Sequence, residues 1–177
     1  MDYWILLKLK FSGNGDFILK YYIGLGSNMG VRENYLKVAI NELMKIGKIG
    51  KKSAIYESEP AGYKNQNNFL NALCTLYFDK DVFSLLKQIK RIEKKLGREE
   101  TIKWGPRVID LDIIDCDGQK IKSDKLNIPH PEMQKRNFVL LPLSEIEPDY
   151  RHKNGKMVKQ LLEVCPEAFI RRYKKQW

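Results

Sequence analysis

Two acidic residues, Asp110 and Asp112, are spaced so that they could bind a metal ion together. They lie in residues 108–114, whose leucine and β-branched residues predict a strand. Side chains at i and i+2 of a strand leave the same face, and two like charges held side by side repel unless a cation lies between them. Mg²⁺ prefers carboxylate oxygens together with water and phosphate oxygens. The pair therefore favours a magnesium–phosphate site, and an acidic, solvent-exposed strand face is the alternative.

A basic segment comes directly before this pair. Residues 87–107 hold eight basic and three acidic residues, and Arg98 and Arg107 flank a Trp-Gly-Pro turn. The planar guanidinium group of arginine binds phosphate oxygens in two places at once. Arginines that lead into a carboxylate pair are typical of Mg–nucleotide chemistry, because they neutralise charge on the transferring group. The alternative is a solvated helix face with Lys–Glu pairs, which suits Arg107 less well because it lies close to Asp110.

Other residues could hold a flat ligand. Phe69 and Asn71 are two apart in a predicted strand and share a face, and Phe138 follows later in the chain. Two aromatic rings and an amide could sandwich a heterocycle and read its edge by hydrogen bonds. Taken singly, each phenylalanine is more often a core residue. His130 lies between two prolines, where a structural role is the ordinary interpretation.

The glycines Gly24 and Gly26 do not complete a nucleotide-binding motif, since the sequence contains neither GxGxxG nor GxxxxGK[ST]. They predict a tight strand-to-helix turn with Ser27 or Asn28 as the helix cap, and a turn that lines a substrate is the alternative.

The hydrophobic pattern predicts the elements that must position these groups. Strands are expected over residues 3–11 and 17–25 (a hairpin), 53–58, 68–79 and 108–114; helices are expected over 31–46 and 81–97, the second opened by Asp81, with a further helical stripe near 158–162. From Leu19 onward the order is β-α-β-β-α-β, the ferredoxin-like pattern. We expect an α+β fold with a ferredoxin-like βαββαβ core, a three-layer α/β/α arrangement and extra C-terminal elements. One domain, 1–177, is the economical interpretation, with residues 1–18 as an N-terminal extension that adds a strand or hairpin.

Composition limits the class of protein. The 177 residues are 43% hydrophobic, which is typical of a globular chain, and no apolar run approaches the roughly 20 residues of a membrane helix. The cysteines Cys74, Cys116 and Cys165 are widely spaced and form no CxxC pair, which argues against a disulfide framework and a zinc site. The N-terminus does not resemble a signal peptide, so a cytoplasmic location is expected.

The formal net charge of +10 favours an anionic partner. Residues 151–177 hold eight basic and only two acidic residues, so most of the surplus lies outside the motifs. An RNA-binding ferredoxin-like domain would need an aromatic string on a central strand, which residues 74–78 do not supply. A different metal-dependent nucleotidyl transferase on a similar sheet stays an alternative.

Taken together, these stretches resemble the hydroxymethyl-dihydropterin pyrophosphokinases of folate biosynthesis. The resemblance is dense from residue 21 to about residue 150. It is carried by Tyr22-Ile23-Gly24-Leu25-Gly26-Ser27-Asn28, Tyr56-Glu57-Ser58-Glu59-Pro60, Asn68-Phe69-Leu70-Asn71-Ala72, Arg91-Ile92-Glu93, the specific run Trp104-Gly105-Pro106-Arg107-Val108-Ile109-Asp110-Leu111-Asp112-Ile113, Ile128-Pro129-His130-Pro131, Met133, and Arg136-Asn137-Phe138-Val139-Leu140-Leu141-Pro142-Leu143.

The resemblance implies an enzyme that transfers pyrophosphate from ATP to the hydroxymethyl group of 6-hydroxymethyl-7,8-dihydropterin and releases AMP, with two Mg²⁺ ions. It implies catalytic roles for Arg98, Arg107, Asp110 and Asp112, with Asp110 and Asp112 as the metal ligands. The ATP-binding residues that it implies are Lys90, Glu93, Trp104, Arg107, Ile113, Lys125, Asn127, His130 and Arg136. The pterin-binding residues that it implies are Ser58, Pro60, Ala61, Phe69, Asn71 and Phe138. The partners are small molecules, with neither nucleic acid nor membrane, and we expect a monomer, with association with or former fusion to a neighbouring folate-pathway enzyme as a further expectation.

The sequence departs from the family pattern in two regions. The loop from Arg98 to Trp104 is one residue shorter than is usual and carries Glu99 and Glu100 where basic residues are common. Residues 1–16 lie upstream of the usual start.

Overall fold

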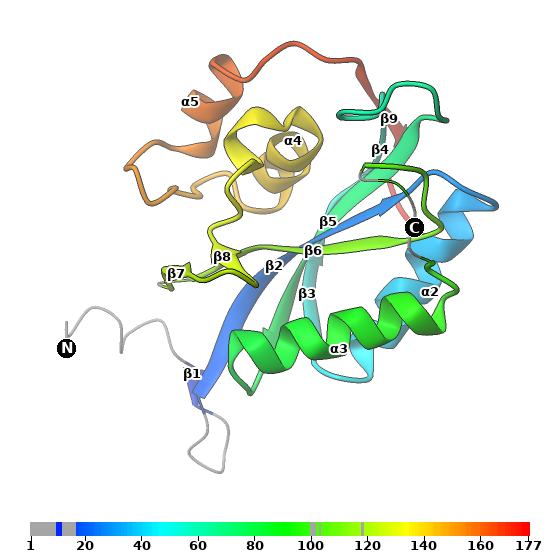
Figure 1. Cartoon of the computed structure of the whole chain (residues 1–177). Coiled ribbons are helices and arrows are strands. Elements are labelled where there is room, and N and C mark those ends of the chain that lie inside the picture. Colours follow the sequence, from blue (N-terminus) through cyan, green and yellow to red (C-terminus); the bar gives the residue numbers. More distant parts are fainter. Residues whose placement is uncertain (1–9, 12–16, 100–101, 103, 118) are drawn as a thin grey trace.

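The computed structural model describes residues 10–11, 17–99, 102, 104–117 and 119–177 (Figure 1). It is a mixed α/β structure in which an antiparallel sheet lies between helices. The strands are β1 (Lys10–Phe11), β2 (Phe17–Ser27), β3 (Lys48–Lys52), β4 (Ile55–Ser58), β5 (Phe69–Phe78), β6 (Asp110–Cys116) and β9 (Ile170–Lys174), with β7 (Ile121–Lys122) and β8 (Asn127–Ile128) as a separate pair. The helices are α2 (Arg32–Met44), α3 (Val82–Lys95), α4 (Asn137–Ile146) and α5 (Val158–Glu163), with a 3₁₀ turn over Met133–Lys135.

The long strand β2 is central to the sheet. It pairs with β5 on one side and with β6 on the other, and β1 pairs with its first residues. The strands β3 and β4 pair with successive parts of the far edge of β5, and β9 pairs with β4. The C-terminal strand therefore extends the sheet beyond the part of the chain that carries the motifs.

Each face of the sheet packs against its own helices, because side chains alternate along a strand. Tyr21 and Ile23 belong to a core that includes Leu85 of α3 and Leu36 of α2. Tyr22, between them, belongs to a second core with residues of α4 and α5. The structure thus has three layers, with α2 and α3 on one side and α4 and α5 on the other (Figure 1).

Several predicted elements are confirmed. Helices α2 and α3 lie within the ranges predicted from periodicity, α5 matches the expected helical stripe, and β5 matches the strand expected over 68–79. The Asp81 side chain caps α3 by accepting hydrogen bonds from the backbone N–H groups of Phe83 and Ser84, at 2.8 and 3.1 Å. The strand expected over 108–114 is present but runs from Asp110 to Cys116.

Other predictions were wrong. The N-cap of α2 is Val31, which makes no side-chain capping bond, rather than Ser27 or Asn28. The strand expected over 53–58 begins at Ile55, and the strand β3 before it was missed because Lys-Ile-Gly-Lys-Lys is almost entirely exposed and has no apolar alternation. The strand β9 was missed for the same reason, since only its first residue is partly buried.

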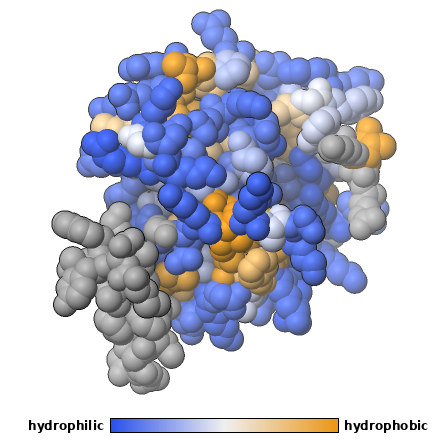
Figure 2. Space-filling view, turned by 60° about the vertical axis from the view of Figure 1, so that its left-hand side comes forward, coloured by the Kyte–Doolittle hydropathy of each residue, from blue (hydrophilic) through white to orange (hydrophobic). Residues whose placement is uncertain are grey.

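The N-terminal hairpin can be followed only in part. Residues 1–9 and 12–16 lie outside the described residues, and within the described part Lys10 and Phe11 pair with Ile18 and Phe17. In the described ranges, the structure contains no helix that is both long and apolar enough to span a bilayer. On the face shown in Figure 2, hydrophobic residues form small groups within a mainly hydrophilic surface.

Candidate active site

A cavity lies between the sheet and α4, on the face that carries the two aspartates. Side chains from β5, β6 and α4 and the loops around residues 58–61 and 104–107 surround it. Its lining consists of Gly24, Leu25, Gly26, Ser58, Ala61, Phe69, Asn71, Ala72, Leu73, Trp104, Arg107, Asp110, Asp112, Ile114, Arg136, Phe138 and Val139.

The glycines of β2 form the floor of the cavity. Gly24 lies opposite Asp112, and Gly26 lies between Asp110 on β6 and Asn71 on β5. A Cβ atom at Gly26 would lie 3.3 Å from Asn71 Oδ1, and a Cβ atom at Gly24 would lie 3.2 Å from the Ile114 side chain. Side chains here would therefore fill the space, which supports the substrate-lining interpretation of these glycines.

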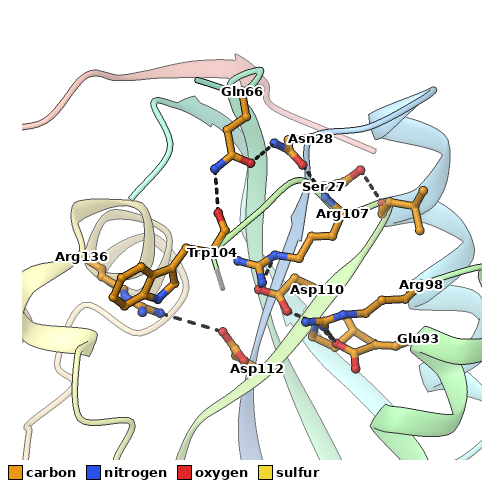
Figure 3. Close-up of polar contacts among 12 residues, drawn as sticks. Ser27, Asn28, Gln66, Glu93, Arg98, Trp104, Arg107, Asp110, Asp112 and Arg136 are labelled. Carbon is orange, nitrogen blue, oxygen red and sulfur yellow. Dashed lines mark hydrogen bonds and ion pairs between the residues drawn. The ribbon is translucent and has the colours of Figure 1, made fainter. Parts of the chain in front are cut away.

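The side chains of Asp110 and Asp112 lie near each other (Figure 3), and both residues line the cavity. Asp110 Oδ1 accepts a hydrogen bond from Arg98 Nη1 at 2.6 Å, whereas among the described residues Asp112 is paired with Arg136, 4.0 Å away. Desolvation by the surrounding protein, and then the negative charge of the Asp110 carboxylate, raise the pKa of Asp112 to about 6. This occurs even though 37% of the Asp112 side chain is exposed.

This donor set fits a hard divalent cation. Asp110 is paired with Arg98 and Arg107, whereas Arg136 only approaches Asp112, at 4.0 Å, so a cation between the two carboxylates would relieve their repulsion. Within the described residues, no third His, Cys, Asp or Glu joins the pair to complete a metal-binding cluster. A metal held here would take its other ligands from water and from substrate oxygens.

Three arginines converge on the acidic pair. Arg98 binds Asp110, Arg107 Nε lies 3.3 Å from Asp110 Oδ2, and Arg136 approaches Asp112 (Figure 3). Among the described residues, Arg107 Nε makes this ion pair but has no hydrogen-bond acceptor.

Glu93 binds Arg98 and fixes its position. Its side chain is only 3% exposed, and it accepts hydrogen bonds from Arg98, from Lys90 Nζ at 2.8 Å and from the Leu111 backbone N–H at 2.8 Å. Glu93 therefore links α3 to β6 and orients an arginine. It does not line the cavity.

Phe69 and Phe138 line the cavity from the sheet and from α4. The Arg107 guanidinium lies 5.7 Å from the centre of the Phe69 ring, and the Arg136 guanidinium lies 5.8 Å from the centre of the Phe138 ring. The buried Asn71 amide donates to Ser58 Oγ at 2.9 Å, which fixes its orientation. The aromatic pair and the amide expected from the sequence are thus brought to one cavity.

Two loops meet at the mouth of the cavity. Asn28 Nδ2 donates to Gln66 Oε1 at 2.9 Å, and Gln66 Nε2 donates to the Trp104 carbonyl at 2.7 Å (Figure 3). Asn28 also exchanges hydrogen bonds with the Arg107 backbone, at 2.8 and 3.2 Å. Gly62 has φ +91°, and a Cβ atom there would lie 3.1 Å from the Trp104 ring. Sequence reasoning assigned Asn28 to a helix cap and missed Gln66, because these bonds join segments far apart in the chain.

The structure does not place every predicted ligand residue at the cavity. Those that line it are Ser58, Ala61, Phe69, Asn71, Trp104, Arg107, Asp110, Asp112, Arg136 and Phe138. Those outside its lining are Pro60, Lys90, Glu93, Arg98, Ile113, Lys125, Asn127 and His130. Ile113 packs in the core on the opposite face of the sheet, and Lys125 and Asn127 are exposed on the segment that carries β7 and β8.

His130 is held by its backbone and ring. Its N–H donates to the Ile114 carbonyl at 2.7 Å, and its Nδ1 accepts from the Glu132 N–H at 3.2 Å. Burial, and then the Arg136 charge, lower the pKa of His130 to about 4. The imidazole is neutral near pH 7.

Comparisons with known proteins show the family of the chain. The chain matches the family described as 7,8-dihydro-6-hydroxymethylpterin-pyrophosphokinase (HPPK) over residues 22–148. It is 42% identical over 150 residues to the 2-amino-4-hydroxy-6-hydroxymethyldihydropteridine pyrophosphokinase of Aquifex aeolicus, covering 85% of this chain and 92% of that protein. It is 43% identical over 127 residues to the Bacillus subtilis protein of the same name, covering 71% of this chain and 76% of that protein.

Longer proteins also contain a similar region. The chain is 46% identical over 131 residues to the folic acid synthesis protein FOL1 of Dictyostelium discoideum, covering 74% of this chain but 20% of that protein. Its fold is similar to a crystal structure of wild-type HPPK-DHPS from Plasmodium falciparum, with a TM-score of 0.64 at 17% identity, over 84% of this chain and 45% of that chain. The family match over residues 22–148 and the identity to full-length relatives lead to one conclusion: the chain belongs to the HPPK family and is an ATP-dependent pyrophosphokinase.

Proposed function

We propose that this protein transfers pyrophosphate from ATP to the hydroxymethyl group of 6-hydroxymethyl-7,8-dihydropterin and releases AMP, as a step of tetrahydrofolate biosynthesis. The observation that carries the proposal is the combination of groups in one cavity. A carboxylate pair with Arg107 and Arg136 lines the cavity together with Phe69, Phe138 and Asn71. The first set suits a metal–polyphosphate, and the second suits a flat heterocycle with hydrogen-bonding edges.

Asp110 and Asp112 are the residues that would hold two Mg²⁺ ions with the ATP phosphates. Bound there, the ions would stabilise both the attacking and the leaving oxygens of an in-line displacement. Asp112 would bind in its ionised form, which its raised pKa disfavours in the absence of a cation.

The arginines would neutralise charge on the polyphosphate. Arg107 lines the cavity and is paired with Asp110, and Arg98 is fixed by Glu93, so both charges are held in place before the reaction. The pterin hydroxyl oxygen forms a bond to the β-phosphorus and loses its proton to water, and the bond from that phosphorus to the α–β bridging oxygen breaks, so AMP leaves. His130 is neutral and its Nδ1 is already hydrogen-bonded, so it fits nucleotide contact rather than a role as general base.

Phe69 and Phe138 would stack on the pterin, with Asn71, Ser58 and Ala61 along its edge. Glycine at position 26 leaves room for the ring, since a Cβ atom there would approach Asn71 Oδ1 and the Phe69 ring, at 3.3 and 3.7 Å. Of the further ATP contacts implied by resemblance, Trp104 lines the cavity. Those at Lys90, Ile113, Lys125 and Asn127 would need the nucleotide to extend beyond the cavity over the edge of β6.

We also infer a ferredoxin-like core of β2, α2, β3 with β4, β5, α3 and β6. The antiparallel neighbours β6–β2–β5 and the pairing of β3 and β4 with β5 support it. We propose that residues 1–177 form one domain and that the protein acts as a monomer in the cytoplasm. In two proteins named for folic acid synthesis, the similar region is about a fifth of the length. We therefore propose that this protein associates with another enzyme of folate synthesis.

The test is incubation of the purified protein with ATP, Mg²⁺ and 6-hydroxymethyl-7,8-dihydropterin, with chromatographic identification of the nucleotide product. AMP supports the proposal, whereas ADP or the absence of turnover contradicts it. The Asp112→Ala variant should lose turnover but still bind pterin when no metal is added. The control is Asp124→Ala, because Asp124 is exposed and lies outside the cavity, so its turnover should match the wild type.

A further inference from the structure

Glu57 is a buried carboxylate directly beside the cavity but on the other face of the sheet. Its side chain is 9% exposed, and it precedes Ser58, which lines the cavity. Successive residues of a strand point to opposite faces, so Glu57 is directed away from the cavity. A buried carboxylate is costly unless it is paired and hydrogen-bonded.

Two arginines from distant segments supply this pairing. Arg171 of β9 donates to Glu57 Oε2 from Nε at 2.9 Å and from Nη2 at 2.5 Å, and Arg32 of α2 donates to Glu57 Oε1 at 3.0 Å. These bonds, those from Arg171 above all, hold the pKa of Glu57 below its usual value. Glu57 therefore joins the C-terminal strand to α2 at the end of β4.

Arg32 extends the connection to the start of β5. Its Nη1 also donates to the Asn68 carbonyl at 2.7 Å, immediately before Phe69. Ser58 and Phe69 lie opposite each other in the β4–β5 pairing, and both line the cavity. The Glu57 network thus contacts both strands at the point where they carry cavity residues.

The loop between these strands, residues 59–68, is held at both ends. At the first end, the Glu59 N–H donates to the Phe169 carbonyl at 3.3 Å, and Glu59 Oε1 accepts from the Phe169 N–H at 3.1 Å, which ties the loop to the residue before β9. At the other end, Arg32 binds the Asn68 carbonyl. Most of the loop is exposed, so it has little packing of its own to fix its position.

We infer that Glu57 is a positioning residue for the pterin subsite, and that the basic C-terminal strand sets pterin affinity by clamping Glu57 through Arg171. This inference rests on the proposed function. The contacts of Glu57 are with β9, α2 and the start of β5, whereas Asp110 and Asp112 lie across the sheet on β6. Loosening the clamp should therefore impair pterin binding more than nucleotide binding.

The Arg171→Ala variant tests this inference, because Arg171 is 65% exposed on an edge strand and its removal leaves no cavity. We expect the KM for pterin to rise about fivefold, at the low end of measured couplings between sites, with the KM for ATP changing less than about twofold. The Arg171→Lys variant should recover part of the loss. The Glu57→Gln variant keeps the size of the side chain. It should show the same pattern as Arg171→Ala, with a raised KM for pterin and a KM for ATP that changes little.

The matched control is Lys174→Ala. Lys174 lies on the same strand and pairs with a glutamate of α2, since its Nζ lies 2.7 Å from Glu33 Oε1, but it does not contact Glu57. Its KM for pterin should equal that of the wild type. An unchanged KM for pterin in Arg171→Ala, or an equal rise in Lys174→Ala, would overturn the inference.

Amide hydrogen exchange separates this inference from the proposed function, because it needs no substrate. Exchange of residues 59–68 should be faster in Arg171→Ala than in the wild type or in Lys174→Ala. Equal exchange in all of these proteins would refute the clamp. A wild-type protein that forms no AMP but shows the exchange difference would refute the proposed function and leave the clamp standing.

Discussion

Replacing Glu93 by glutamine tests how the arginine of the site is held. The Glu93 side chain is 3% exposed, and its Oε1 accepts from both the Leu111 N–H and Arg98 Nη1. The amide oxygen of glutamine can keep both bonds, but without the charge. The bond from the Leu111 N–H becomes a neutral one, and the bond from Arg98 keeps the arginine's charge but loses the ion pair. Because a charge-assisted hydrogen bond is roughly twice as strong as a neutral one, we expect about 1 kcal/mol to be lost at each. We expect Glu93→Gln to lower the free energy of unfolding by about 2 kcal/mol.

Two variants bracket this value. Lys90 also binds Glu93, but its side chain is 53% exposed and can turn to water. Lys90→Met should therefore cost less than about 0.5 kcal/mol. Glu93→Ala leaves the Leu111 N–H buried without its acceptor and removes one of the two carboxylates that bind Arg98, so it should cost about 4 kcal/mol.

The assay is urea unfolding followed by far-UV circular dichroism, for the wild type and the variants at one pH and ionic strength. The expected order of unfolding free energies is wild type, Lys90→Met, Glu93→Gln and Glu93→Ala, from highest to lowest. The reasoning would be refuted by a Glu93→Gln protein as stable as the wild type. It would also be refuted if Lys90→Met cost as much as Glu93→Gln, because exposed and buried partners would then contribute equally.

Two further predictions concern other parts of the molecule. Burial raises the pKa of Asp115 to about 6, so the folded state binds the Asp115 proton more tightly than the unfolded state does. Proton binding should therefore stabilise the folded state fully below about pH 4. This contribution to the free energy of unfolding, at most about 3 kcal/mol, should be lost as the pH rises through about 6. As the pH is lowered across this range, urea unfolding should show the wild type gaining that amount relative to Asp115→Asn, and a constant difference between the two would contradict the assignment. Gly62→Ala should displace Trp104 and increase acrylamide quenching of tryptophan fluorescence, because the new Cβ would lie 3.1 Å from the ring at a φ of +91°. Gly155→Ala is the control, since its φ is +87° with no heavy atom within 4 Å; equal quenching in the two variants would show that Gly62 does not position the ring.

The site was predicted from sequence where its groups are close together in the chain. The i, i+2 spacing of Asp110 and Asp112, and that of Phe69 and Asn71, requires only that each segment be a strand, and both pairs do face one cavity. The role of Glu93 could not be predicted in this way. A glutamate on a basic helix suggests an exposed ion pair, and only its burial against β6 makes it a support for Arg98.

The edges of the sheet were also beyond prediction. Strands β3 and β9 are short, basic and largely exposed, so they lack the apolar alternation that identifies a strand. Each exists because its backbone pairs with a neighbour, β5 or β4, whose sequence does carry that signal. Residues 151–177 are basic and lie outside every motif, yet their strand β9 joins the sheet next to Ser58.

By itself, the sequence determined the helices α2 and α3, the Asp81 cap, the strand β5 and the shared face of the two aspartates, because periodicity and capping are local properties of the chain. Tertiary structure alone decided the Asn28–Gln66–Trp104 connection, the Arg98–Glu93 support and the Arg171–Glu57–Arg32 clamp. Each of these joins residues from different segments. Their bonds depend on which side chains are buried together, and burial is set by how the whole sheet and its helices pack.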